Sequence, residues 1–251
     1  MFDQLIQHGQ YSEYDASYKS SEILSALAFL HNIGVVHADL KPENILLCSE
    51  HKGSQTIKII DFGCASTDKR GEETLFSERH EQVNGKLSTQ SIGTKAYWSP
   101  ERFSPTTEGV REAADLYAVG VILFIMLVGV HPFDVTGFAT DEEIERGIQK
   151  ISPPMHLASH LSPSARDFIK SLMNPNPNER LTAITALQHP WIRGVTASSD
   201  AIEGSDTKLS MYQDLRDTLA TAIFATLVDS QHLRSGNNKS MPQQSLTNLL
   251  K

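Results

Sequence analysis

Residues 37–44, HADLKPEN, bring a carboxylate, a cation and an amide close together in the chain. Pro42 and the end of the helical pattern before it place this stretch in a loop. The spacing of Asp39, Lys41 and Asn44 would let the three side chains meet at one small anionic centre. We therefore expect this loop to act on an anionic group.

A second motif, Asp61-Phe62-Gly63, follows directly after the apolar run Ile57–Ile60. Gly63 permits the turn that lets a carboxylate face a metal ion. Asp61 and Asn44 are both oxygen donors, which suit Mg²⁺, and Mg²⁺ takes its remaining ligands from phosphate and water. Either motif alone has an ordinary explanation, because an aspartate in a surface loop is usually a turn former. Their succession, with a hairpin-like pair of strands between them, favours a magnesium and phosphate site.

The elements that must position these loops are mainly helical. Helices are expected at residues 2–7, 12–32, 112–128, 140–150, 163–173 and 181–188, and short strands at 45–47 and 56–60. Ser12, with Asp15 three residues later, is typical of a helix start. One apolar helix face is expected to carry Ile23, Leu24, Leu27, Phe29 and Leu30. Leu116–Val130 spans 15 residues, fewer than the about 18 of a transmembrane helix, so it predicts a buried core helix.

Composition narrows the possible partners. The net charge of −8 and the pI of about 5.7 argue against nucleic acid and against an anionic membrane, since both favour a basic patch. The two cysteines, Cys48 and Cys64, give neither a disulfide framework nor a metal-binding spacing, which indicates a reducing compartment. The first residues lack the basic and apolar pattern of a secretion signal. We therefore expect a cytoplasmic protein.

Further motifs follow in a fixed order: GTKAYWSPE at 93–101, DLYAVG at 115–120, HPF at 131–133, and Arg180 with HPWI at 189–192. Over residues 1 to about 193 this order resembles the eukaryotic protein kinase family, Ser/Thr type. The opening FDQLIQHGQYSE, GTKAYWSPE and HPF look most like the calcium/calmodulin-dependent group. The resemblance implies a mainly α fold, a helical bundle with short β hairpins that corresponds to the C-terminal lobe, with the N-terminal β lobe absent. It also implies two parts, a truncated kinase domain at 1–193 and a tail at 194–251.

The resemblance assigns ATP and Mg²⁺ as cofactors. It implies that Asp39 is the catalytic base and that Lys41 lies near the transferred γ-phosphate. Asn44 and Asp61 would hold Mg²⁺, and Leu46 would lie beneath adenine. The implied nucleotide-binding set is Lys41, Glu43, Asn44, Leu46 and Asp61.

Other residues receive supporting roles from the same resemblance. Thr94 would touch Asp39 and Lys41, and with Lys41 it indicates a protein substrate with a Ser or Thr hydroxyl. Glu101 and Arg180 resemble a buried pair that ties the activation segment to the lobe. The resemblance implies structural roles for His37, Phe62, Gly63 and Asp115, with Asp115 capping the backbone of the catalytic loop.

Two features depart from the family pattern. Ala38 replaces the usual arginine, which in the family pairs with a phosphorylated residue of the activation loop. We therefore expect activation not to require a phosphate in residues 64–92. The segment Asp61–Glu101 has 41 residues, longer than usual, and its polar centre is either a solvated loop or a regulatory docking loop.

Neither a glycine-rich loop nor a Val-Ala-Ile-Lys strand stands before residue 37. Three explanations remain open. The chain is an incomplete version of an ordinary kinase, a truncated protein that binds partners without catalysis, or a lobe completed by another chain. Intact Asp39, Lys41, Asn44 and Asp61 favour the first.

The tail after residue 193 has three expected parts. Gly194–Thr207 is expected to be a linker, residues 208–228 an amphipathic helix, and residues 230–251 disordered. The helix either packs back on the lobe or serves as an autoinhibitory or partner-binding helix. It is too acidic for a typical calmodulin target.

Overall fold

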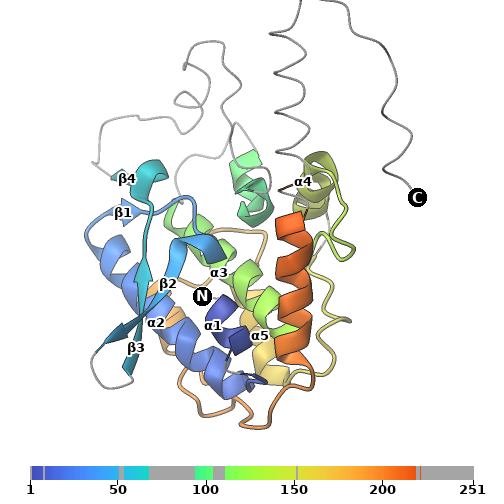
Figure 1. Ribbon diagram of the computed structural model, residues 1–251. Coiled ribbons are helices and arrows are strands. Elements are labelled where there is room, and N and C mark those ends of the chain that lie inside the picture. Colours follow the sequence, from blue (N-terminus) through green and yellow to red (C-terminus); the bar gives the residue numbers. More distant parts are fainter. Residues whose placement is uncertain are drawn as a thin grey trace, which may run out of the picture. The chain divides into compact units, whose positions relative to one another are not determined.

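The computed structural model describes residues 2–7, 9–50, 54–67, 94–103, 111–150, 152–218 and 221. The helices are α1 (Phe2–Gln7), α2 (Glu13–Asn32), α3 (Arg111–Val128), α4 (Asp141–Lys150), α5 (Pro163–Leu172) and α6 (Ala183–Leu187). The strands are β1 (Val35–Val36), β2 (Ile45–Glu50), β3 (Ser54–Ile59) and β4 (Ser66–Thr67). Short 3-10 turns are η1 (Pro42–Asn44), η2 (Phe62–Cys64), η3 (Thr94–Tyr97) and η4 (Pro100–Phe103). A mainly helical fold with few short strands is therefore confirmed for the described residues (Figure 1).

The start of α2 follows from its sequence. The Ser12 hydroxyl accepts a hydrogen bond from the Asp15 amide at 3.1 Å, and the Asp15 carboxylate accepts one from the Ser12 amide at 2.9 Å. This reciprocal pair satisfies amides that the first helical turn leaves without partners. Leu27 is buried as predicted, but Phe29 is 64% exposed, so its predicted place on the buried face is wrong. Two residues along a helix turn the side chain by about 200°, which carries Phe29 to the opposite side.

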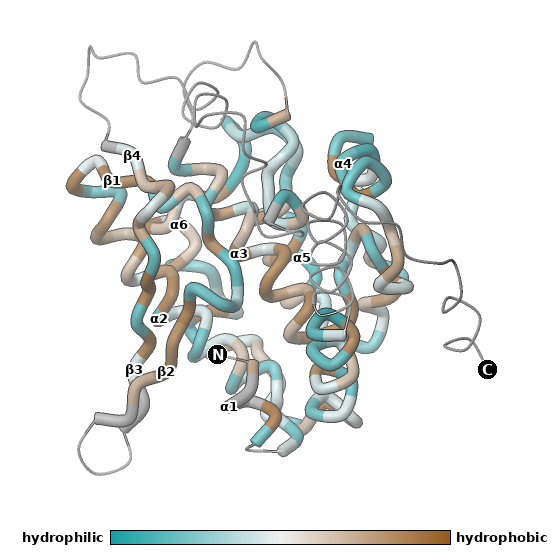
Figure 2. The backbone as a smooth tube through the Cα atoms, turned by 45° about the horizontal axis from the view of Figure 1, so that its top comes forward, coloured by the Kyte–Doolittle hydropathy of each residue, from teal (hydrophilic) through white to brown (hydrophobic). Residues whose placement is uncertain are grey.

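Helix α3 is the centre of the core. Nearly every side chain from Leu116 to Leu127 is buried, as expected for a helix that is apolar all round. It contacts α2 and α5, which flank it in Figure 1, and the brown colouring of these helices in Figure 2 marks their apolar content. Gly120 allows a close approach, because a Cβ atom there would lie 2.5 Å from Met173 Cγ. The prediction of a buried core helix is confirmed.

In the described part of the chain, no helix combines the length and the apolar character that crossing a bilayer requires.

Two small antiparallel sheets bring the sequence motifs together. Strand β1 pairs with β4, Val35 opposite Thr67, and β2 pairs with β3, Ile45 opposite Ile59. Residues 37–44 leave β1 and enter β2, whereas residues 60–65 leave β3 and enter β4. Because both strand pairs are in register, these two connections lie next to each other. The strand predicted at 45–47 is observed and extends to Glu50, and the strand predicted at 56–60 is observed at Ser54–Ile59.

The segment Gly194–Thr207, predicted to be a linker, forms hydrogen bonds with the residues before α2. The Ile202 amide donates to the Tyr11 carbonyl at 2.9 Å, and the Tyr11 amide donates to the Ser205 hydroxyl at 3.1 Å. The segment is thus bonded to the residues before α2. A few hydrogen bonds hold the segment in this way, and such bonds leave no apolar periodicity in the sequence.

The tail helix begins at residue 205, three residues earlier than predicted. Leu209 is fully buried, and Tyr212 meets Phe2 edge to face with ring centroids 6.3 Å apart. Within residues 205–213 this helix therefore packs against the residues of α1 and the core. Residues 214–251 form a separate unit, in which 214–218 are helical. The predictions for 68–93 and 230–251 concern stretches outside the described residues.

Candidate active site

Asp115, near the start of α3, holds the beginning of the loop at 37–44. Its carboxylate accepts hydrogen bonds from the backbone amides of His37 and Ala38, both at 2.9 Å. It also lies 3.0 Å from His31 Nε2 at the end of α2. Asp115 is 1% exposed, and hydrogen bonds to a buried carboxylate are strong because the surroundings screen them little. The loop is therefore tied to two helices at its first residues.

His37 links this loop to the segment that carries Asp61. Its Nε2 lies 2.9 Å from the Ile60 carbonyl, and its ring meets the Phe62 ring edge to face with centroids 5.0 Å apart. The His37 side chain is completely buried. These contacts hold the two motifs at a fixed separation.

The reacting groups expected from the sequence lie side by side in the loop. Lys41 Nζ lies 2.8 Å from Asp39 Oδ2, and Asn44 Nδ2 donates to the Asp39 carbonyl at 2.8 Å. The side chains of Asp39 and Lys41 keep 11% and 15% of their exposure, so both are held by protein yet reachable from solvent. A carboxylate beside an ammonium group can take up a proton while the cation balances phosphate charge.

Asn44, at the end of η1, and Asp61, just before η2, lie on neighbouring backbone segments. The Ile60 amide donates to the Asn44 carbonyl at 2.9 Å, which places residue 61 next to the end of η1. Asp61 is exposed and has φ +63°, and its carboxylate accepts a long 3.3 Å hydrogen bond from the Gly63 amide. The Asn44 amide group uses its nitrogen on Asp39, which leaves its oxygen for a cation. An amide oxygen and a carboxylate fit Mg²⁺, which prefers oxygen ligands and needs few from protein.

Glu43 and Leu46, both assigned to nucleotide binding from the sequence, are exposed on η1 and β2. Leu46 keeps 42% of its surface and lies opposite Lys58 in the hairpin. Thr94 opens η3, and its side chain is outside the described residues. The contact expected between Thr94 and the Asp39–Lys41 pair therefore stays a prediction.

Arg180 and Glu101 join the end of the segment 94–103 to the helical lobe. Two hydrogen bonds of 2.7 and 2.9 Å connect the guanidinium to the two carboxylate oxygens. Arg180 also donates to the carbonyls of Ala113 and Asn174, and its guanidinium lies 5.1 Å from the Tyr117 ring centroid. Burial raises the pKa of the Tyr117 phenol, so this ring stays neutral beside the pair.

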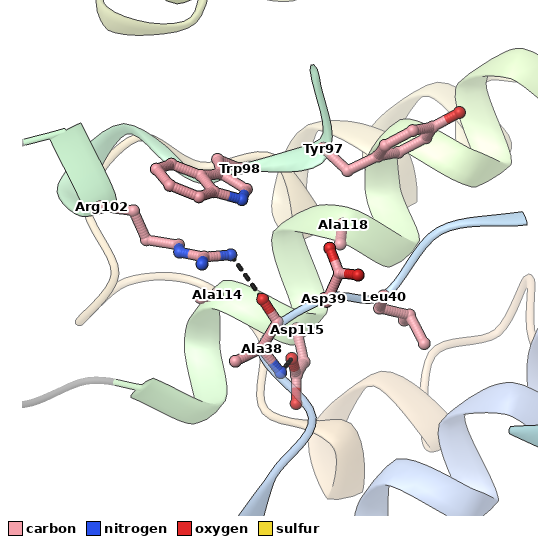
Figure 3. Close-up of a pocket in the computed structure, with 9 residues that line it drawn as sticks. All are labelled: Ala38, Asp39, Leu40, Tyr97, Trp98, Arg102, Ala114, Asp115 and Ala118. Carbon is pink, nitrogen blue, oxygen red and sulfur yellow. Dashed lines mark hydrogen bonds between the residues drawn. The ribbon is translucent and has the colours of Figure 1, made fainter. Parts of the chain in front are cut away.

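Arg102 is a site residue that the sequence patterns did not indicate. It comes from η4, and its Nη1 donates to the Ala38 carbonyl at 2.6 Å (Figure 3). Its guanidinium carbon lies 4.0 Å from the centre of the Trp98 ring. Arg102 belongs to no periodic pattern, and the one available signal was the missing cation at position 38.

Comparison with known proteins identifies the family of the chain. The profile of the family described as "Protein kinase domain" matches residues 1–192. Serine/threonine-protein kinase PKZ1 of Phytophthora infestans is 34% identical over 217 residues, which cover 80% of this chain and 49% of that protein. Calcium/calmodulin-dependent protein kinase type 1 of Caenorhabditis elegans is 36% identical over 209 residues, covering 82% of this chain and 53% of that protein. The chain thus spans about half the length of these curated relatives. It belongs to the protein kinase family.

Proposed function

We propose that this chain is the C-terminal lobe of a Ser/Thr protein kinase, which in its complete form transfers the γ-phosphoryl group of ATP to a Ser or Thr hydroxyl of a protein. The observation that carries the proposal is the 2.8 Å contact between Asp39 and Lys41 in a loop fixed by Asp115. Family membership and the names of the two relatives support the same reaction class.

The chain's own residues supply defined parts of this reaction. The substrate hydroxyl oxygen bonds to the γ-phosphorus, the bond from that phosphorus to the β–γ bridging oxygen breaks, and ADP leaves. Asp39 accepts the hydroxyl proton, and Lys41 offsets the negative charge on the transferred group. Asn44 and Asp61 would hold Mg²⁺, which neutralises phosphate charge when bound.

The rest of the nucleotide site is proposed to come from outside residues 1–251. Residues 1–36 contain neither the glycine-rich loop nor the lysine strand that cover ATP phosphates in this family. Leu46, Ile60 and Phe62 are each more than one-third exposed around the candidate site, as expected of a surface that another lobe covers. Without that cover the phosphates are poorly positioned, so we expect weak ATP binding by the 251 residues alone.

The test compares two proteins, the 251-residue chain and the longest protein encoded by the transcripts of its gene. Each is incubated with radiolabelled ATP, Mg²⁺ and a Ser/Thr peptide mixture, with Asp39→Asn as the matched control. The proposal is supported if the longer protein transfers the label and its Asp39→Asn variant does not. Equal label with and without the Asp39 carboxylate, or no transfer by either protein, contradicts it and favours a non-catalytic interaction module.

We further infer a regulatory partner at the tail. The Tyr212 hydroxyl lies 3.2 Å from the Tyr97 hydroxyl, so the tail helix reaches the segment that follows Thr94. A partner that removes the helix would change the support of that segment. Tyr212→Phe keeps the ring and removes this contact, whereas deletion of residues 205–251 removes the whole helix. If neither change alters activity, the inference is contradicted.

A further inference from the structure

Position 38 is held from both sides. The Ala38 amide donates to Asp115 Oδ1 at 2.9 Å, and its carbonyl accepts from Arg102 Nη1 at 2.6 Å. Its φ is +64°, in the left-handed region that residues with a side chain seldom occupy. Such backbone persists only where the surroundings fix it, and Ala38 directly precedes Asp39. The peptide that leads into Asp39 is therefore set by two side chains.

Arg102 is seated on an aromatic platform. Its guanidinium lies over the Trp98 ring, and Trp98 in turn packs against Phe103 with ring centroids 5.4 Å apart. Figure 3 shows the guanidinium between this ring and the Ala38 carbonyl. A planar cation can stack on a ring and donate from its edge at the same time, which an ammonium group cannot do equally well.

The electrostatics of the site favour a fixed cation. Burial lowers the pKa of Arg102 to about 10, and the carboxylates of Asp115 and Asp39 act in the opposite direction. Arg102 therefore stays charged at neutral pH. Desolvation strengthens its hydrogen bond to the Ala38 carbonyl, since water competes less for either group.

We propose that Arg102, seated on Trp98, is a positioning residue for Asp39. It links the end of the activation segment at η4 to the catalytic loop and fixes the peptide between Ala38 and Asp39. The inference rests on the proposed phosphoryl transfer, in which Asp39 must face the substrate hydroxyl. It requires no contact of Arg102 with ATP or with the substrate.

The kinetic test uses Arg102→Met, Arg102→Lys and a control, Arg193→Met, which removes an exposed arginine outside the site. Kinetics are measured on whichever of the two proteins defined above transfers phosphate. We expect Arg102→Met to lower kcat by about 10- to 100-fold, because a displacement of about 1 Å at reacting groups has an effect of this size. The KM for ATP should not change, and Arg102→Lys should restore part of kcat. A kcat for Arg102→Met equal to that of Arg193→Met overturns the proposal.

A double-mutant cycle separates positioning from general stability. Trp98→Phe keeps a ring, Trp98→Ala removes it, and each is combined with Arg102→Met. If ring and guanidinium act as one unit, the loss of kcat in Trp98→Ala with Arg102→Met matches that in either single variant. If the loss of kcat in the double variant equals the product of the two single losses, the ring and the guanidinium act independently and this part of the proposal is overturned. If Arg102→Met does not fold, the same comparison is made with Arg102→Lys and Trp98→Phe. A kcat equal to that of Arg193→Met in both variants overturns the proposal.

A measurement without catalysis keeps this inference distinct from the proposed function. The 251 residues contain two tryptophans, and Trp191 is completely buried, so acrylamide quenching reports on Trp98. Quenching should increase in Arg102→Met and stay unchanged in Arg193→Met. If quenching does not increase, the positioning role of Arg102 on Trp98 is overturned, even if the protein transfers phosphate. If quenching increases but neither protein transfers phosphate, the contact between Arg102 and Trp98 stands and the proposed function is overturned.

Discussion

Arg180 and Glu101 lie 79 positions apart in the sequence and form a two-pronged ion pair in which the Arg180 side chain is fully buried. This pair connects the end of the activation segment to the turn before α6. Arg102 follows Glu101 in the chain and reaches in another direction, to Ala38 in the loop at 37–44. Two neighbouring residues thus fix the same short turn, η4, to two separate parts of the lobe.

Arg180→Met should lower the free energy of unfolding by about 3–5 kcal/mol, because it leaves the Glu101 carboxylate, whose side chain is 9% exposed, without its partner. Urea unfolding followed by circular dichroism measures this change. Arg193→Met, at an exposed arginine, is the control and should shift stability little. A loss below about 1 kcal/mol, the size seen for exposed pairs, would show that the pair is not desolvated.

Asp115→Ala should destabilise the loop at 37–44, since the amides of His37 and Ala38 would lose their shared acceptor. Each buried donor left without an acceptor costs about 1–3 kcal/mol. Hydrogen exchange of the peptide that spans 35–41 should become faster. Asp167→Ala, at an exposed carboxylate, should leave this exchange unchanged, and equal rates in both variants would contradict the anchoring role.

Replacing every serine and threonine of residues 64–92 by alanine should preserve phosphate transfer. Position 38 is an alanine and has no side-chain cation to bind a phosphate, whereas the Ala38 carbonyl is already held by Arg102. Steady-state kinetics of the complete protein, with and without phosphatase treatment, provide the measurement. Loss of activity in the alanine variant would show that a phosphate in this loop is required.

Cys64 should react slowly with iodoacetamide at neutral pH although it is exposed. Partial desolvation raises the pKa of its thiol above the ordinary value of 9.0, and the nearby Asp39 carboxylate raises it further. A raised pKa reduces the thiolate fraction, so the alkylation rate should still be rising at pH 9.0. Mass spectrometry of a Cys48→Ser variant isolates this thiol. A rate that levels off below pH 9.0 would contradict the prediction.

Much of the architecture could be predicted from the sequence because local rules apply. The Ser12–Asp15 cap and the apolar α3 both follow from residue type and spacing. The course of residues 195–204 could not be predicted, because single bonds such as that from Ile202 to Tyr11 leave no periodic signal. Phe29 was predicted to be on the buried face because it is apolar, although its angular position on α2 places it on the opposite side.

The candidate site divides in the same way. The positions of Asp39, Lys41, Asn44 and Asp61 follow from short motifs whose spacing is local. Arg102 depends on a turn that carries it across to Ala38, 64 positions earlier, which no local pattern encodes. In the sequence, the alanine at position 38 showed that the usual cation is missing there. It did not show that Arg102 supplies one.

The most direct test of the central claim is Mg²⁺-dependent transfer of labelled γ-phosphate to Ser or Thr peptides by the longest product of the gene. This protein should transfer the label, and the transfer should be lost on chelation of Mg²⁺. Asp39→Asn should lower kcat by about 10²- to 10⁴-fold, as expected for removal of a catalytic base, while ATP binding persists. Asp61→Asn should weaken Mg²⁺-dependent ATP binding. Transfer that is unchanged in Asp39→Asn and Asp61→Asn would contradict the account.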